Sequence, residues 1–176
     1  LMIYATDSGE TTPLIDLDGR SGSGTISLAN TTTLEILGTL TDAYSSTIDM
    51  GAASILDISQ PWELGAGAVV EVDAVQLFPV AAGLFARIAG AEVTLAGGST
   101  VNVNSGKLEI DADLVGQAGA VINVFDNATL ELGGTATIND TETINLRHDS
   151  TTLVVPGQMT IEDRSGGFDW HGRGGS

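Results

Sequence analysis

Two carboxylates near the start of the chain have the spacing of a calcium-binding turn. Asp16 and Asp18 are two residues apart and Gly19 follows, a residue type suited to tight turns. Hard cations such as Ca²⁺ take several oxygen ligands, and Asp-x-Asp-Gly opens many loops that supply them. The later ligands of an EF-hand loop do not follow. Asp16 and Asp18 are therefore candidate Ca²⁺ ligands, and a generally acidic surface is the competing interpretation.

Further carboxylates are spaced as general acid–base pairs would be, which is the chemistry that cleaves polysaccharides. The candidates are Asp111 with Asp113, Asp140 with Glu142, and the group Arg147, His148 and Asp149. Alternate residues of a strand point the same way, so Asp111 and Asp113 are expected to share a face. With 23 Asp and Glu residues, adjacent pairs also arise from composition alone. We therefore predict solvated acids and no enzyme activity.

The aromatic and imidazole side chains offer few alternatives. His148 and His171 stand beside no Ser or Cys in a nucleophile motif, and exposed turns are expected for both. Trp62 and Trp170 have ring faces that would stack on a sugar, which makes them candidate glycan-binding residues. A packed corner or the cap of a repeat is the alternative for both tryptophans.

Charge and composition exclude several classes of function. Six Lys and Arg residues against 23 Asp and Glu give a net charge of −17, which argues against nucleic acid or an anionic membrane as a partner. The absence of Cys excludes disulfides and thiolate metal sites. No apolar run approaches the roughly 18 residues of a transmembrane helix. The chain opens on Leu1, and we expect it to be an excerpt or a processed product.

The elements that must position these residues are short strands. Apolar and polar residues alternate in brief segments such as 33–36, 55–58, 69–72, 92–95, 100–103, 107–110, 121–124, 129–132 and 143–146. Gly, Asn, Asp, Ala and Ser, which suit turns, separate them. The chain is therefore predicted to be nearly all β.

The spacing of the apolar positions predicts how the strands are arranged. Two series recur every 22 residues, the first through Leu14, Ile36, Ile58 and Val80, and the second through Leu28, Met50 and Val72. The alternation resumes as Ile110, Val124, Leu132, Leu146, Val154 and Phe168, and a third apolar position falls at Leu64, Ile138 and Ile161. Three strands per 22 residues predict a parallel β-solenoid (β-helix), whose turns stack at about 4.8 Å.

Roughly eight rungs of 22 residues would account for the whole chain. Rungs are expected over residues 1–79 and 92–167, with an irregular apolar insertion or short helix over 80–91 and a Gly-rich tail or further repeat over 168–176. The alternative fold is an antiparallel β-sandwich or jelly roll, which has no reason to keep a constant period.

The ends and strands of the chain resemble those of very large secreted bacterial repeat proteins. Phe168, Trp170 and Gly172 form an aromatic-x-Trp-x-Gly stretch, and strands such as Gly119–Val124 and Asn127–Leu132 have a similar style. The chain thus resembles the adhesin and autotransporter-passenger-like β-solenoids. The resemblance implies an extracellular or cell-surface location and a structural or adhesive role.

The sequence therefore predicts a structural or adhesive solenoid segment of a large extracellular or filament-forming protein. Open solenoid ends expose unpaired backbone, so self-association end to end or packing against neighbouring repeats is expected. Surface glycans are candidate ligands, whereas nucleic acid and membrane insertion are not expected. Two alternatives are a phage virion protein (fibre, spike or capsid decoration) and a carbohydrate-binding or carbohydrate-cleaving β-helix.

Overall fold

The computed structural model describes residues 2–3, 14–15, 25–40, 43–74, 85–125, 127–139, 143–148 and 150–162. Every regular element among these residues is a β-strand, and no helix occurs there. The strands are rich in Val, Ile, Leu and Thr, which fit a pleated, half-buried surface. The prediction of an all-β chain is confirmed.

Three parallel sheets form the body of the molecule. The seven-stranded sheet contains, in spatial order, β1 (Met2–Ile3), β4 (Thr33–Ile36), β7 (Ile55–Ile58), β10 (Ala86–Gly90), β13 (Lys107–Ile110), β16 (Thr129–Leu132) and β19 (Thr152–Val154). The six-stranded sheet contains β3 (Thr25–Leu28), β6 (Thr47–Gly51), β9 (Val69–Asp73), β12 (Thr100–Ser105), β15 (Val121–Val124) and β18 (Thr143–Leu146). The five-stranded sheet contains β8 (Trp62–Leu64), β11 (Glu92–Leu95), β14 (Asp113–Gly116), β17 (Ala136–Asn139) and β20 (Met159–Glu162). Two short strands, β2 (Leu14–Ile15) and β5 (Thr39–Leu40), pair with each other.

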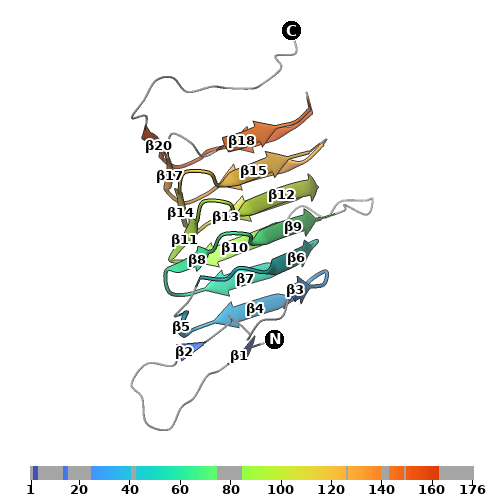
Figure 1. The fold of residues 1–176 in the computed structure, drawn as a ribbon. Helices are drawn as coiled ribbons and strands as arrows, with labels where there is room; N and C mark the ends of the chain where they lie inside the picture. The colour runs from blue at the N-terminus through green and yellow to red at the C-terminus, as the bar shows by residue number, and fades with distance from the viewer. Residues whose placement is uncertain are drawn as a thin grey trace.

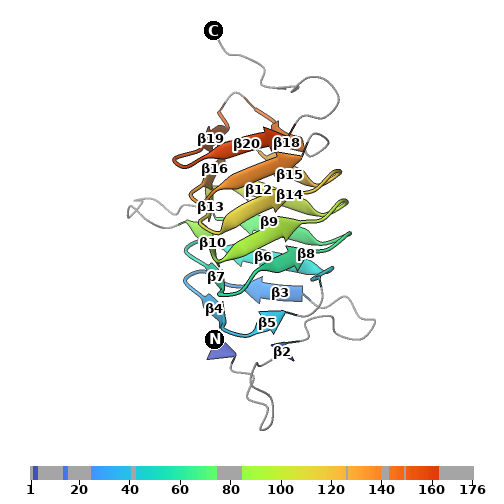
Figure 2. The same ribbon diagram turned by 90° about the vertical axis from the view of Figure 1, so that its left-hand side faces the viewer.

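The chain coils through these sheets as a parallel β-solenoid. From β7 onward each turn contributes one strand to the seven-, five- and six-stranded sheets in succession, and each strand pairs with its equivalent in the next turn. Figures 1 and 2 show the turns stacked one above another. The predicted β-solenoid is confirmed, and the antiparallel alternative is wrong because the observed strand pairs are parallel.

The number of turns differs from the expected eight. About five turns with strands in all three positions run from β4 to β18, and β19 and β20 begin another. The remaining expected rungs fall largely on residues outside the described ranges, including Val80 and Phe168.

The predicted period is present in the strand register. Ile55 pairs with Thr33 and Thr129 with Lys107, both steps of 22 residues. The exception is the step from β7 to β10, where Arg87 pairs with Ile55, 32 residues away. The ten additional residues correspond in length to 75–84, which lie outside the described residues.

The boundaries of the expected insertion therefore need correction. Residues 86–90, which we expected to belong to an irregular segment or short helix over 80–91, form β10 between β7 and β13. Ala86 and Ile88 alternate with Arg87, so the short segment has the inward and outward pattern of a strand.

Two members of the predicted apolar series also pair differently. Leu14 pairs with Thr39 and not with Ile36. Val154 pairs with Glu131, because the step from β16 to β19 is 23 residues, and one added residue moves Val154 to the outward set. By contrast, Leu28, Met50 and Val72 lie opposite one another as predicted.

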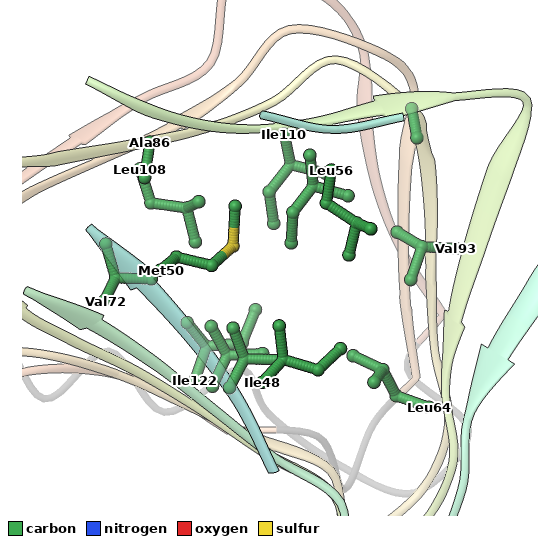
Figure 3. Close-up of a cluster of buried hydrophobic side chains, with 14 of the residues drawn as sticks. Ile48, Met50, Leu56, Leu64, Val72, Ala86, Val93, Leu108, Ile110 and Ile122 are labelled. Atoms are coloured by element: carbon green, nitrogen blue, oxygen red, sulfur yellow. The ribbon is translucent and has the colours of Figure 1, made fainter. Parts of the chain in front are cut away.

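Inward-facing aliphatic side chains fill the solenoid. Figure 3 shows side chains such as Ile48, Leu56, Leu64 and Ile122 meeting in the interior, and each is at most 1% exposed. Burial of one such side chain contributes roughly 1.5–3 kcal/mol relative to leaving it in water. The inward ladders are therefore the main source of stability.

The corners between sheets repeat their backbone conformation from turn to turn. The corner that leads from the six-stranded to the seven-stranded sheet has a left-handed residue in four turns, namely Thr31, Ala53, Gly106 and Asn127, with φ between 55° and 71°. The corner before the six-stranded sheet uses Gly67, Gly98 and Gly119 with φ of 82° or 87°. The similar corners keep the polar outer faces of successive turns aligned.

Candidate functional site

The densest group of ionisable side chains lies on the outer face of the seven-stranded sheet. Arg87 of β10, Glu109 of β13 and Glu131 of β16 are direct neighbours in the strand register. They alternate with buried residues such as Ile88 and Ile110, so they face outward. Lys107, two residues before Glu109, and Asp111, two residues after it, complete the group. We call these five residues the Glu109 cluster.

Ion pairs connect the members of this cluster across turns. The Arg87 guanidinium donates to Asp111 in a close ion pair. Lys107 Nζ lies 3.2 Å from Glu109 Oε2 and 2.6 Å from Glu131 Oε2. The Lys107 ammonium also lies 4.4 Å from the centre of the Phe85 ring, within the range of a cation–π contact.

The cluster shifts the protonation of two of its members. Burial lowers the pKa of Lys107, but the bonds to Glu131 and Glu109 outweigh burial and raise that pKa above its usual value. Burial and a hydrogen bond with Asp111 raise the pKa of Glu109, and Lys107 opposes that rise. The Lys107 ammonium is therefore held charged, while Glu109 takes up a proton more readily than an isolated glutamate.

A ladder of amide side chains follows the outer face of the six-stranded sheet. Asn145 Nδ2 donates to Asn123 Oδ1 at 3.0 Å, and Asn123 Nδ2 donates to Asn102 Oδ1 at 2.9 Å. Asn102 Nδ2 in turn donates to Glu71 Oε1, and Asn104 Nδ2 to Glu71 Oε2, both at 2.8 Å. These bonds join β9, β12, β15 and β18 one after another, and we call Glu71, Asn102, Asn123 and Asn145 the amide ladder.

Arg147 adds a positive charge to the amide ladder. Its Nε and Nη2 donate to Asn123 Oδ1 at 3.1 and 2.7 Å, and its guanidinium lies 5.7 Å from the centre of the Phe125 ring. The carboxylate of Glu71 accepts at the other end. The amide dipoles thus run between a cation and an anion, an arrangement in which each hydrogen bond polarises the next.

Asp111 and Asp113 do not form the expected pair. Asp111 follows β13 of the seven-stranded sheet, whereas Asp113 begins β14 of the five-stranded sheet, with the buried Ala112 between them. The expectation of a shared face is wrong because the chain turns a corner at Ala112. Asp113 accepts bonds from Thr135 N at 2.9 Å and from Thr135 Oγ1. These two bonds lower the pKa of Asp113.

Trp62, the first candidate for sugar stacking, is a core residue. It faces inward on β8 opposite Val93 and is 5% exposed. Its Nε1 is buried without a hydrogen-bond partner in the described part of the chain. Trp62 therefore presents no ring face to a sugar and occupies the packed position that was the alternative.

Several predicted site residues cannot be placed. Asp16, Asp18, Asp140, Glu142, Asp149, Trp170 and His171 lie outside the described residues. His148 is described and exposed, as expected for a turn histidine. Within the described ranges, no three His, Cys, Asp or Glu side chains gather where they could hold a metal ion. Nor does the described part of the chain contain a helix that is long and apolar enough to cross a membrane.

The sequence contained a signal for the amide ladder that reasoning from motifs missed. Asn102, Asn123 and Asn145 recur at nearly the solenoid period, each between two inward apolar residues. A search of the polar positions with the same period would have found them. The Glu109 cluster carried no comparable signal, because Arg87 follows the insertion that breaks the period.

Comparisons with protein-family models, with curated proteins and with solved structures found no match to this chain. The fold and the contacts on its outer faces therefore provide the basis for inferring function.

Proposed function

We propose that the chain is a rod-forming segment of a larger extracellular protein, with a structural or adhesive role, and that it stacks end to end on neighbouring repeats or copies. The observation that carries this proposal is the use of polar outer side chains to link turns. Arg87, Lys107 and Arg147, the Lys and Arg residues of the described part, all bond to a side chain in an adjacent turn. Groups engaged in this way stiffen a rod and are not free to act on a substrate.

The ends of the described solenoid support the end-to-end part of the proposal. Inward residues of the middle turns, such as Val70 and Ile122, are fully buried. Inward residues of the outermost turns are only partly buried, namely Ile26 and Leu40 at one end and Ile144, Leu146, Leu153, Val155 and Met159 at the other. A solenoid with such ends gains stability when a further turn covers them.

Sedimentation velocity over a range of protein concentrations, with negative-stain electron microscopy, tests the proposal. The 176-residue chain is expected to form rods that lengthen with concentration. Met159→Lys, at the end of the five-stranded sheet, is expected to shorten the rods, whereas Val115→Lys, outward on β14 in the middle of the same sheet, is the matched control. A monodisperse monomer at all concentrations would refute end-to-end stacking.

The extracellular setting is supported by the acidic surface and by the resemblance of the chain to secreted repeat proteins. Antibody labelling of intact source cells, before and after permeabilisation, tests this location. Labelling that requires permeabilisation would contradict it.

A further inference from the structure

The Glu109 cluster has an excess of one negative charge in a partly buried setting. Three carboxylates, those of Glu109, Asp111 and Glu131, face two cations, Arg87 and Lys107. The Glu109 side chain is the least exposed of the five, at 16%. Charge repulsion between neighbouring strands is therefore poorly screened by water at this position.

The contacts of the two cations show which carboxylate is left least compensated. The Arg87 guanidinium bonds to Asp111, although Glu109 is its direct neighbour in the strand register. The Lys107 ammonium lies closer to Glu131 than to Glu109, at 2.6 Å against 3.2 Å. Glu109 thus shares one cation with Glu131 while the carboxylate of Asp111 lies beside it on the same strand end.

We propose that Glu109 and Asp111 share a proton and act as a clasp, so that uptake of one proton balances the cluster and holds the turns of β10, β13 and β16 together more tightly. Protonation converts a repulsive pair into a hydrogen bond in which one carboxyl donates to the other carboxylate. It also leaves Lys107 to pair with Glu131 alone. The described charged groups that face Glu109 are Arg87 and Glu131 on the adjacent strands and Lys107 and Asp111 on its own.

The sign of the effect follows from proton linkage. The pKa of Glu109 is raised by burial and by Asp111 above 4.5, the usual value for a glutamate. Folding therefore favours the protonated form, and the added stability appears as pH falls through the folded-state pKa and is fully present below 4.5. The clasp should thus make the solenoid more stable in mild acid than at neutral pH.

Thermal melting of the full chain, from neutral pH down to about the ordinary pKa of a free glutamate, tests the clasp. The melting temperature of the wild type is expected to rise by about 1–3 °C over this range, as one partly buried carboxyl warrants in a domain of this size. Glu109→Gln, which stays neutral and keeps a donor for Asp111, should melt higher than the wild type at neutral pH and show little further rise. A Glu109→Gln variant with the full wild-type rise would overturn the proposal.

A matched variant separates the clasp from general charge relief, since acid also reduces the repulsion of a chain with net charge −17. Glu63→Gln removes one outward carboxylate on the five-stranded sheet, opposite Thr94 and outside the cluster. Glu63→Gln is expected to keep the wild-type rise in acid. Loss of the rise in both variants would overturn the proposal in favour of general charge relief.

A direct readout does not depend on any variant folding. Carboxyl ¹³C shifts of Glu109 and Asp111 in the wild type should report a coupled titration, with Glu109 protonated above 4.5. Lys107→Met should move this titration to higher pH, because Lys107 stabilises the carboxylate form of Glu109. Independent titration of the two carboxyls, with Glu109 behaving as an isolated glutamate, would overturn the clasp and leave the rod-forming function untouched.

Discussion

Lys107 Nζ lies 2.6 Å from Glu131 Oε2, on the next strand of the seven-stranded sheet and 24 residues further along the chain. Arg87 reaches Asp111 over the same step, and Arg147 reaches back to Asn123 over the same distance in sequence. The step is one turn of 22 residues plus two, which leads from an outward side chain to the diagonal outward neighbour in the adjacent turn. The few cations of this acidic chain thus join successive turns.

Replacement of Lys107 tests how much such a link contributes. Lys107→Met is expected to lower the free energy of unfolding by about 1 kcal/mol, because Glu109 and Glu131 lose a shared counter-ion in a partly exposed setting. The wild type should lose this contribution above pH 10.5, as pH rises through the raised folded-state pKa of Lys107. Urea unfolding at neutral and alkaline pH measures both effects. Lys107→Arg serves as the charge-conserving control, and a Met variant as stable as the wild type in low salt would contradict the role.

Asp113 is expected to give the opposite pH dependence. Its pKa is lowered by the bonds from Thr135, so its stabilising contribution is present above 3.8, the usual pKa of an aspartate, and is lost as pH falls through the folded-state value. Asp113→Asn and Thr135→Val should therefore each reduce stability at neutral pH and flatten the loss of stability in strong acid. Melting curves between neutral pH and about pH 2 measure this. An unchanged acid limb in both variants would count against the assignment.

The amide ladder makes Asn123 a sensitive position. Asn123 is 7% exposed, and its Oδ1 accepts from Asn145 and Arg147 while its Nδ2 donates to Asn102. Asn123→Leu is expected to cost about 2–3 kcal/mol, since several partly buried donors and an acceptor lose their partner. Urea unfolding measures this loss, and Asn104→Ser, which removes a single bond to Glu71, is the milder control.

A double-mutant cycle shows whether the ladder acts as a unit. Asn123→Leu and Arg147→Met should cost less together than the sum of their separate effects, because Arg147 has no ladder acceptor left once Asn123 is gone. Strict additivity in equilibrium unfolding would show that the ladder consists of independent bonds.

The left-handed corner residues provide a test of backbone strain. Ala53 and Gly106 occupy equivalent corners with φ of 55° and 71°. Ala53→Gly is expected to stabilise the chain by about 0.5–1 kcal/mol, because glycine adopts this conformation without the penalty of a Cβ. Gly106→Ala should destabilise it by more, since the new Cβ would lie 2.0 Å from the Ala74 carbonyl oxygen. Chemical unfolding of the two variants compares them, and equal effects would refute a shared corner geometry.

The period of the apolar residues sufficed to predict the architecture. Leu28, Met50 and Val72, as well as Leu64, Ile138 and Ile161, lie in continuous inward ladders because a solenoid aligns equivalent positions turn after turn. The same logic failed at Val154, where one added residue exchanges inward for outward positions. It also failed at β10, where an insertion of ten residues conceals the period.

The outer contacts were harder to predict because they depend on diagonal neighbours. Arg87 bonds to Asp111, although its register partner is Glu109. Pairing Arg87 with its ladder neighbour alone would have given the wrong ion pair. Asp111 and Asp113 were misjudged for a related reason, since the alternation of a strand does not continue around a corner.

Trp62 offers a final test of the packed interior. Its indole N–H is buried with no acceptor in the described part of the chain, so Trp62→Phe removes an unsatisfied donor while it keeps an aromatic ring on β8. Trp62→Phe is expected to change the free energy of unfolding by less than about 1 kcal/mol, because the relief of the buried N–H offsets the lost volume. Trp62→Ala leaves a cavity beside Val93 and should cost about 3–5 kcal/mol. Urea unfolding of both variants measures the difference. A Phe variant as unstable as the Ala variant would show that the indole N–H makes a stabilising bond in solution.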